Sequence, residues 1–237
     1  MKKIFCNLNT KEFILNNIML IPTSDFFTAN FLFKGETIET FTIPHVMPSQ
    51  VHGNKILVVD AKTPSEFFLP SRPEADGILL TVPGVQASLR FADCAPVMLW
   101  GTSPDWVMIL HSGYKGTVLN ISREGLELVS EIFGNESSRQ SSAWIGPCIG
   151  REYFRKSNDE WTTKGIETFH SGNFDIDGEG EKVYFDLAAE IRCQLLDCGL
   201  RSQRIALSGI DTLKDERCYS YRKGDVLERM TLTVKLS

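Results

Sequence analysis

Three residues that lie far apart in the sequence, His52, Cys94 and His111, have side chains and local settings suited to chemistry. The chain has only four histidines, at positions 45, 52, 111 and 170. His52 stands beside a glycine just before an expected strand, and His111 ends an expected buried strand at a glycine-rich turn. Strand ends and the turns after them often carry functional groups. The alternative for each is a structural histidine with satisfied hydrogen bonds.

Cys94 lies in the sequence Asp93-Cys94-Ala95-Pro96, directly before an apolar run. A cysteine in this setting is usually a small core residue. The alternative is a thiolate activated by a histidine or a metal. Two histidines and one cysteine are a three-ligand zinc set that leaves the fourth position open. The sequence has no CxxC or HxxxH pair, so a metal site here would be of the open, catalytic type. Asp93 is a candidate proton carrier or partner of a ligand, or simply a turn residue.

Two basic residues are candidates for binding an anion. The turn Ser112-Gly113-Tyr114-Lys115-Gly116 combines flexible glycines, a helix N-terminus and the charge of Lys115. Near the C-terminus, Arg222 follows two tyrosines in Tyr219-Ser220-Tyr221. A phosphate or a carboxylate could bind at either place. The alternative for Lys115 is a solvated lysine in an ordinary N-terminal turn, and that for Arg222 is an edge strand with exposed charges.

The elements that must position these residues follow from the apolar pattern. Short apolar runs predict strands at 12–20, 55–60, 77–81, 85–89, 95–100, 105–110, 204–207 and 230–236. The runs at 95–100 and 105–110 are almost wholly apolar, so both faces should be buried. Helical spacing predicts helices from the turn after His111 to 133, over 158–169, and over 187–198 between a capping Asp186 and Gly199. The segment 171–182 reads as a solvated loop. This mixed order favours an α+β fold over a strict βαβ repeat.

Bulk properties restrict the class of protein. The 237 residues are 42% hydrophobic, and we expect one domain over 1–237. A net charge of −5 is unfavourable for nucleic-acid binding. No apolar run is long enough to span a bilayer, and no signal-peptide core follows the N-terminal lysines. The six cysteines are irregularly spaced, which is typical of free thiols in a reducing compartment. We therefore expect a cytoplasmic protein.

Six motifs occur in one order along the chain: Gln50-Val51-His52-Gly53, Ala75-Asp76-Gly77, Ala92-Asp93-Cys94-Ala95-Pro96-Val97, His111-Ser112-Gly113-Tyr114-Lys115-Gly116, Ile145-Gly146-Pro147-Cys148-Ile149-Gly150 and Ser220-Tyr221-Arg222. Over roughly residues 45–236, the chain therefore resembles the bacterial YfiH / laccase-domain family. Members of that family carry names such as polyphenol oxidase, peptidoglycan editing factor and purine nucleoside phosphorylase.

The resemblance implies both a fold and an activity. The fold would be a layered α/β sandwich, of the α+β class, shared with a group of cysteine hydrolases. His52, Cys94 and His111 would be the catalytic and metal-binding residues, with zinc expected and copper also claimed. Lys115 and Arg222 would bind phosphate. The activity would be phosphorolysis of adenosine, inosine or methylthioadenosine, with adenosine deaminase as an attributed side activity. The partners would be a purine nucleoside and phosphate, without nucleic acid or membrane.

The sequence departs from the family pattern at three places. Tyr114 and Lys115 replace the usual Trp and Arg, and Lys lacks the bidentate fork of Arg. An N-terminal Arg-Gly-Gly segment is missing from residues 22–40, and Arg90 stands where the family has small, uncharged residues.

Other functions remain open at this point. In a Cys/His hydrolase or amidase of the peptidoglycan-precursor editing type, Cys94 would be the nucleophile and His111 the base. A non-catalytic metal-binding module is another alternative. Phenol oxidation by several coppers is disfavoured, because four histidines cannot build several copper sites.

Overall fold

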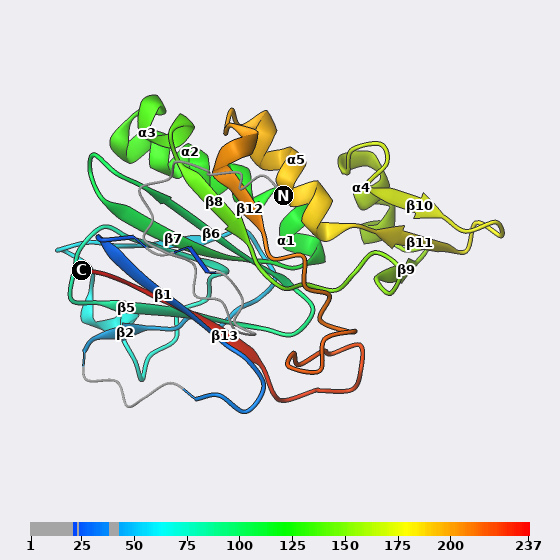
Figure 1. Ribbon diagram of the computed structural model, residues 1–237, viewed down its shortest axis with the longest axis horizontal. Helices are drawn as coiled ribbons and strands as arrows, with labels where there is room; N and C mark the ends of the chain where they lie inside the picture. The colour runs from blue at the N-terminus through cyan, green and yellow to red at the C-terminus, as the bar shows by residue number, and fades with distance from the viewer. Residues whose placement is uncertain (1–20, 23, 38–42) are drawn as a thin grey trace, which may run out of the picture.

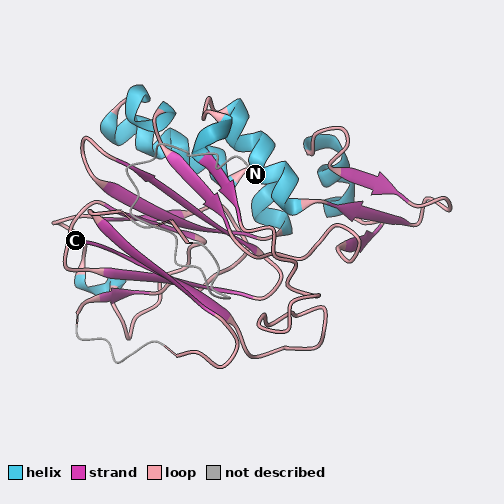
Figure 2. Cartoon of the chain, viewed as in Figure 1, coloured by secondary structure: helices cyan, strands magenta, loops and turns pink. Residues whose placement is uncertain are grey.

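The computed structural model describes residues 21–22, 24–37 and 43–237. The strand predicted over 12–20 lies outside this part of the chain. The described strands form three sheets, and most of the described helices cover one face of the largest (Figures 1 and 2). The architecture is a layered α+β sandwich, so the predicted fold class is confirmed.

The largest sheet of the described residues has six strands of mixed direction. Their order is β12 (Ile205–Leu207), β8 (Ser142–Ile145), β6 (Ala95–Gly101), β7 (Trp106–Ser112), β4 (Gly77–Leu80) and β3 (Ile56–Val59). The four-stranded sheet below it has the order β1 (Phe27–Leu32), β13 (Met230–Leu236), β5 (Gln86–Phe91) and β2 (His45–Val46). A small sheet at one end joins β10 (Phe174–Ile176), β11 (Lys182–Phe185) and β9 (Arg155–Ser157).

The helices lie mainly on the outer face of the six-stranded sheet (Figure 2). They are α1 (Tyr114–Val118), α2 (Ile121–Phe133), α3 (Asn135–Arg139), α4 (Glu160–Thr168) and α5 (Leu187–Asp197), with short 3₁₀ turns at Ser65–Phe67 and Ser202–Arg204. The Asp186 side chain caps α5 by accepting a hydrogen bond from the Ala189 N–H (2.9 Å), and Gly199 follows its end with a positive φ of 91°. Both predicted ends of this helix are confirmed. No helix within the described ranges is both long and apolar enough to cross a membrane.

The central strand β6 explains the two hydrophobic cores. Its side chains alternate between faces, as strand geometry requires. Met98 and Trp100 belong to the core between the two large sheets, whereas Val97 and Leu99 belong to the core under the helices. Every residue of β6 and β7 is buried. The prediction of two doubly buried strands is therefore confirmed.

The segment 171–182 is not entirely a loop, so that prediction was wrong in part. Residues Phe174–Ile176 form β10, which pairs antiparallel with β11. The Phe174 ring lies 6.1 Å from the ring of Phe185, which is fully buried. This aromatic contact holds the strand against the core. The acidic residues around Phe174 made the segment read as a solvated loop.

His45 in β2 is expected to make folding depend on pH. The residue is 3% exposed, and its Nε2 lies 2.8 Å from Ser88 Oγ. Burial lowers the pKa of His45 from its ordinary value of 6.5 to about 4. The unfolded chain therefore takes up a proton at this residue below pH 6.5, while the folded chain resists it. Stability present above pH 6.5 should be lost as the pH falls toward 4, by about 2 kcal/mol at pH 4.5.

Urea unfolding at pH 7 and pH 4.5, compared between the native chain and His45→Gln, measures this effect. The variant lacks the titrating ring, so its free energy of unfolding should fall less between the two pH values. An equal fall in both proteins would show that His45 does not contribute.

Candidate metal centre

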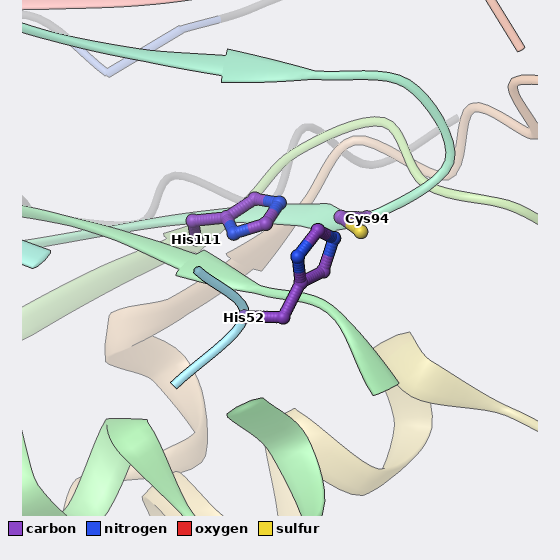
Figure 3. A group of neighbouring side chains, drawn as sticks. All are labelled: His52, Cys94 and His111. Atoms are coloured by element: carbon purple, nitrogen blue, oxygen red, sulfur yellow. The ribbon is translucent and has the colours of Figure 1, made fainter. Parts of the chain in front are cut away.

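The fold brings His52, Cys94 and His111 together from three separate segments. Cys94 directly precedes β6, and His111 lies near the end of β7. These strands are antiparallel neighbours with Pro96 opposite His111, so Cys94 is held close to that histidine. His52 comes from the turn before β3. The predicted proximity of the three residues is thus present in the structure (Figure 3).

The potential ligand atoms of the three residues all lie within 4.8 Å of one another. The two imidazole rings are 4.9 Å apart between centroids and inclined by 70°. His111 is 3% exposed, Cys94 is half-buried and His52 is exposed. The group is therefore anchored in the core at one end and open to solvent at the other, as an open metal site requires.

The donor set fits a zinc ion. Two imidazoles and a thiolate are typical zinc ligands, and ligand atoms around tetrahedral zinc lie about 3.3–3.8 Å apart. The three side chains would need to close by only about 1 Å from their present separation. His111 Nδ1 lies 2.8 Å from Asp76 Oδ1, which leaves Nε2 as the ligand atom. Metal-binding histidines are usually oriented in this way, by a hydrogen bond from the ring nitrogen that does not bind the metal.

Electrostatics favour the ionised form of Cys94. Burial alone would raise the pKa of the thiol, but the charge and hydrogen bond of His111, with a hydrogen bond from His52, lower it below its ordinary value. Burial would also lower the pKa of His111, but the Cys94 thiolate and Asp76 raise it instead. Both shifts favour a thiolate beside an imidazolium, and the thiolate is the form that binds metals.

Asp76 positions the candidate ligands, a role that its place in the motif Ala75-Asp76-Gly77 did not reveal. Its buried carboxylate accepts hydrogen bonds from the backbone N–H groups of Val51 (3.1 Å), His52 (2.9 Å) and Gly53 (2.7 Å), as well as its contact with His111. Burial opposes ionisation, but the hydrogen bonds from His111 and Gly53 outweigh it and lower the pKa of Asp76. One carboxylate thus positions both histidines. The signals in the sequence were its motif and its position just before an apolar strand.

Two residues at the site have unusual backbone conformations. His52 has a φ of 61° and Asp93 a φ of 77°. Such conformations cost about 1–3 kcal/mol in residues other than glycine and concentrate at functional sites. Asp93 accepts hydrogen bonds from the Thr212 hydroxyl and the Arg222 N–H, both at 2.7 Å. Asp93 therefore ties the loops before β13 to the turn that carries Cys94.

Gly113 allows the metal-ligand residues to approach. A Cβ atom at this position would lie 2.7 Å from Cys94 Sγ and 3.2 Å from His52 Cδ2. Its φ of −75° is open to any residue, so the constraint is space alone. We expect Gly113→Ala to displace the sulfur and weaken zinc binding by about 10-fold or more, with a small change in melting temperature. Competition with a coloured chelator measures the affinity.

Gly178→Ala is the matched control, because a Cβ there would meet no atom within 4 Å. Its zinc affinity should equal that of the native chain. Unchanged affinity in Gly113→Ala as well would show that the sulfur position is not critical.

The three residues open into a cavity of about 730 Å³. Its lining includes one acidic residue, Asp93, and five basic residues: Arg72, Arg90, Lys156, Arg222 and Arg229. Arg222, predicted from the sequence to bind an anion, therefore lines this cavity. Lys115 is not among the lining residues. Its Nζ lies 4.8 Å from the centre of the Trp161 ring, so the side chain is directed toward α4. Its predicted role in phosphate binding is not part of the function proposed below.

The fold and the site define a layered α+β protein with a candidate metal centre of two histidines and one cysteine. The family model described as multi-copper polyphenol oxidoreductase laccase matches residues 34–237. The chain belongs to this family, which confirms the resemblance found in the sequence. The description of the family is multi-copper, whereas the described residues contain a single group of His, Cys, Asp and Glu side chains that could hold a metal ion, His52, Cys94 and His111.

Curated relatives carry the name purine nucleoside phosphorylase. The Xylella fastidiosa (strain Temecula1) protein is 26% identical over 184 residues, which cover 77% of this chain and 68% of the relative. The YlmD protein of Bacillus subtilis is 28% identical over 184 residues, 75% of this chain and 65% of the relative. A Rickettsia conorii protein is 27% identical over 154 residues, 65% of this chain and 60% of the relative. The chain thus spans about two thirds or less of the length of these relatives.

Solved structures confirm the fold. The hypothetical protein YfiH of Bacillus licheniformis gives a TM-score of 0.71 at 24% identity, covering 81% of this chain and 74% of that protein. YlmD of Geobacillus stearothermophilus gives 0.69 at 24% identity, covering 81% and 73%.

Proposed function

We propose that this chain is a metal-dependent purine nucleoside phosphorylase acting on adenosine, inosine or methylthioadenosine. The observation that carries the proposal is the combination of His52, Cys94 and His111 with a cavity whose lining is strongly basic. The cavity volume lies within the range of small-molecule sites. The net charge of the chain is negative, so a basic cavity marks local selection for an anion. The names of the relatives point to the same reaction.

The cavity residues would have different roles in phosphorolysis. In this reaction a phosphate oxygen attacks the anomeric carbon, and the bond to the base breaks with its electron pair leaving on the base. The cationic lining, with Arg222 among its members, would hold the phosphate against the sugar. Bound zinc would polarise a substrate oxygen for phosphorolysis, or lower the pKa of a water for adenosine deamination. Asp76 would keep both histidines in position throughout.

Phosphate-dependent release of free base from a nucleoside is the expected result for zinc-loaded protein. Adenosine, inosine and methylthioadenosine would be incubated with and without phosphate, and mass spectrometry would look for base, sugar 1-phosphate and inosine formed from adenosine. Protein stripped with a chelator should be inactive and should recover with zinc. No product from protein with measured stoichiometric zinc would contradict the proposal. A zinc-loaded protein that also fails to bind nucleoside would favour the non-catalytic module.

A Cys/His hydrolase or amidase is the second candidate, and one observation favours it. Asp76, His111 and Cys94 form a chain of contacts in which a carboxylate orients an imidazole beside a thiolate. This is the arrangement of a cysteine nucleophile with its base. A hydrolase of this type would keep its activity in chelator and lose it on thiol alkylation. Loss of activity in chelator alone, restored by zinc, excludes it.

A further inference from the structure

Three arginines, Arg72, Arg90 and Arg229, lie in the lining of the cavity that holds the metal ligands. We call them the arginine trio. Arg90 is on β5, where it pairs with Thr231 of β13. Arg229 directly precedes β13, two residues before the Thr231 that pairs with Arg90. Arg72 comes from the loop between the segments that carry His52 and Asp76. Three parts of the chain thus bring like charges to one wall.

Each guanidinium of the trio is anchored through backbone carbonyl groups. Arg72 donates hydrogen bonds to the carbonyls of Met47 (3.1 Å) and Pro48 (3.0 Å). Arg90 donates to the Leu227 carbonyl at 3.3 Å, and Arg229 donates to the Glu228 carbonyl at 2.7 Å. These bonds orient the side chains without neutralising them. Each guanidinium has five N–H donors, so donors remain for a ligand.

The trio has no carboxylate partner within the described ranges, where the ion pairs all involve other residues. Burial and the charges of Arg229 and Arg72 lower the pKa of Arg90. Arg90 and Arg229 are half-buried and Arg72 is exposed, and the three cations repel one another. Such an arrangement is unfavourable unless an anion offsets it.

The trio is linked to the metal centre through Gln50. The Gln50 side chain donates to the Arg90 carbonyl and accepts from the Arg90 N–H, both at 2.8 Å. Gln50 stands two residues before His52. The position of the Arg90 backbone and that of a metal ligand are thus set by the same short segment.

We propose that the arginine trio is a binding subsite for a phosphate dianion, either free phosphate or the phosphate group of a nucleotide. The inference rests on the proposed function for the identity of the cavity's other occupant. It differs from the prediction made from the sequence, which gave phosphate binding to Lys115 and Arg222. Planar guanidinium forks match the geometry of phosphate oxygens, whereas carboxylates would use only part of the trio. Arg90 also supplies an arginine to a chain that lacks the family's N-terminal Arg-Gly-Gly segment.

Binding is measured by calorimetry on the zinc-loaded full chain, with inorganic phosphate, adenosine and adenosine 5′-monophosphate as separate probes. The variants are Arg72→Gln, Arg90→Gln and Arg90→Lys, with Arg222→Gln as a competitor site and the exposed Arg201→Gln as charge control. Melting temperatures identify any variant that fails to fold. Removing one arginine should weaken phosphate binding by about 10-fold or more. Arg90→Lys should fall between the native chain and Arg90→Gln.

The outcomes separate the two sources of phosphate. Inorganic phosphate binding that falls in the trio variants and not in Arg201→Gln supports free phosphate. Adenosine monophosphate binding more tightly than adenosine, with the same dependence on the trio and no binding of inorganic phosphate, supports a nucleotide. Equal binding of both anions by the native chain and the folded trio variants overturns the proposal. A loss confined to Arg222→Gln overturns it as well.

The same experiment keeps the subsite distinct from the proposed function. Binding is read without turnover, so a trio-dependent phosphate signal in a protein that releases no base would contradict phosphorolysis and leave the subsite standing. Base release with normal phosphate binding in every folded trio variant would support phosphorolysis and contradict the subsite.

Discussion

Cys94→Ser is expected to lower the affinity for zinc by more than about 100-fold and to abolish base release. Residues that merely support metal ligands account for about 10- to 100-fold each, and Cys94 supplies a ligand atom itself. A hydroxyl at this position is a far weaker ligand than a thiolate, because it stays protonated near neutral pH. Zinc content after dialysis, measured by elemental mass spectrometry, and competition with a chelator give the affinity.

Cys193→Ser is the matched control for this prediction. Cys193 is a free, half-buried thiol on α5, outside the lining of the cavity. Its variant should retain one zinc per chain and full activity. If Cys94→Ser bound zinc as tightly as the control, the sulfur would not be a ligand. In that case, loss of activity would point to Cys94 as a nucleophile instead.

Asp76→Asn is expected to weaken zinc binding by about 10- to 100-fold and to destabilise the fold by about 3 kcal/mol. The asparagine is the same size, but its amide nitrogen cannot accept hydrogen bonds. At least one of the four donors that now meet the carboxylate would be left without an acceptor in a buried place. Both histidines would lose part of their orientation at once. Urea unfolding and chelator competition measure the two effects separately.

Asp60→Asn provides the comparison, since the Asp60 carboxylate accepts hydrogen bonds from the Lys62 N–H and the Thr63 hydroxyl in an exposed turn and lies outside the cavity lining. Its zinc affinity should not change. Adding zinc should raise the free energy of unfolding more for the native chain than for Asp76→Asn, because a ligand bound more tightly stabilises the folded state more. An equal rise in both proteins would show that Asp76 stabilises the fold without positioning the metal ligands.

The parts of the fold predicted from the sequence are those specified by local patterns. The strands β6 and β7 are continuous apolar runs, and α5 has its cap and its terminal glycine within the same short segment. The strands β1, β2, β8, β9, β10 and β11 were not predicted. These strands are irregular in pattern or only two to six residues long. Their stability comes from partners elsewhere in the chain, such as β13 for β1, which single-sequence patterns do not record.

The site shows the same division. Residue type and strand-end position were enough to select His52, Cys94 and His111. The role of Asp76 depends on hydrogen bonds that span 23 to 35 residues, so it becomes visible only in the fold. Lys115 lies in α1, at the helix start that the sequence predicted, but the direction of its side chain depends on the packing of Trp161. The arginine trio combines three distant residues and has no local signature.

Cys94 lies in the connection between β5 of the four-stranded sheet and β6 of the six-stranded sheet, whereas His111 belongs to the six-stranded sheet itself. A metal ion bound by Cys94 and His111 would therefore fix the connection between the two sheets to the six-stranded sheet. Metal affinity and the alignment of the two sheets are then linked thermodynamically, and each must influence the other to the same extent. Substitutions deep in the core between the sheets, far from any ligand, would consequently register as changes in metal affinity.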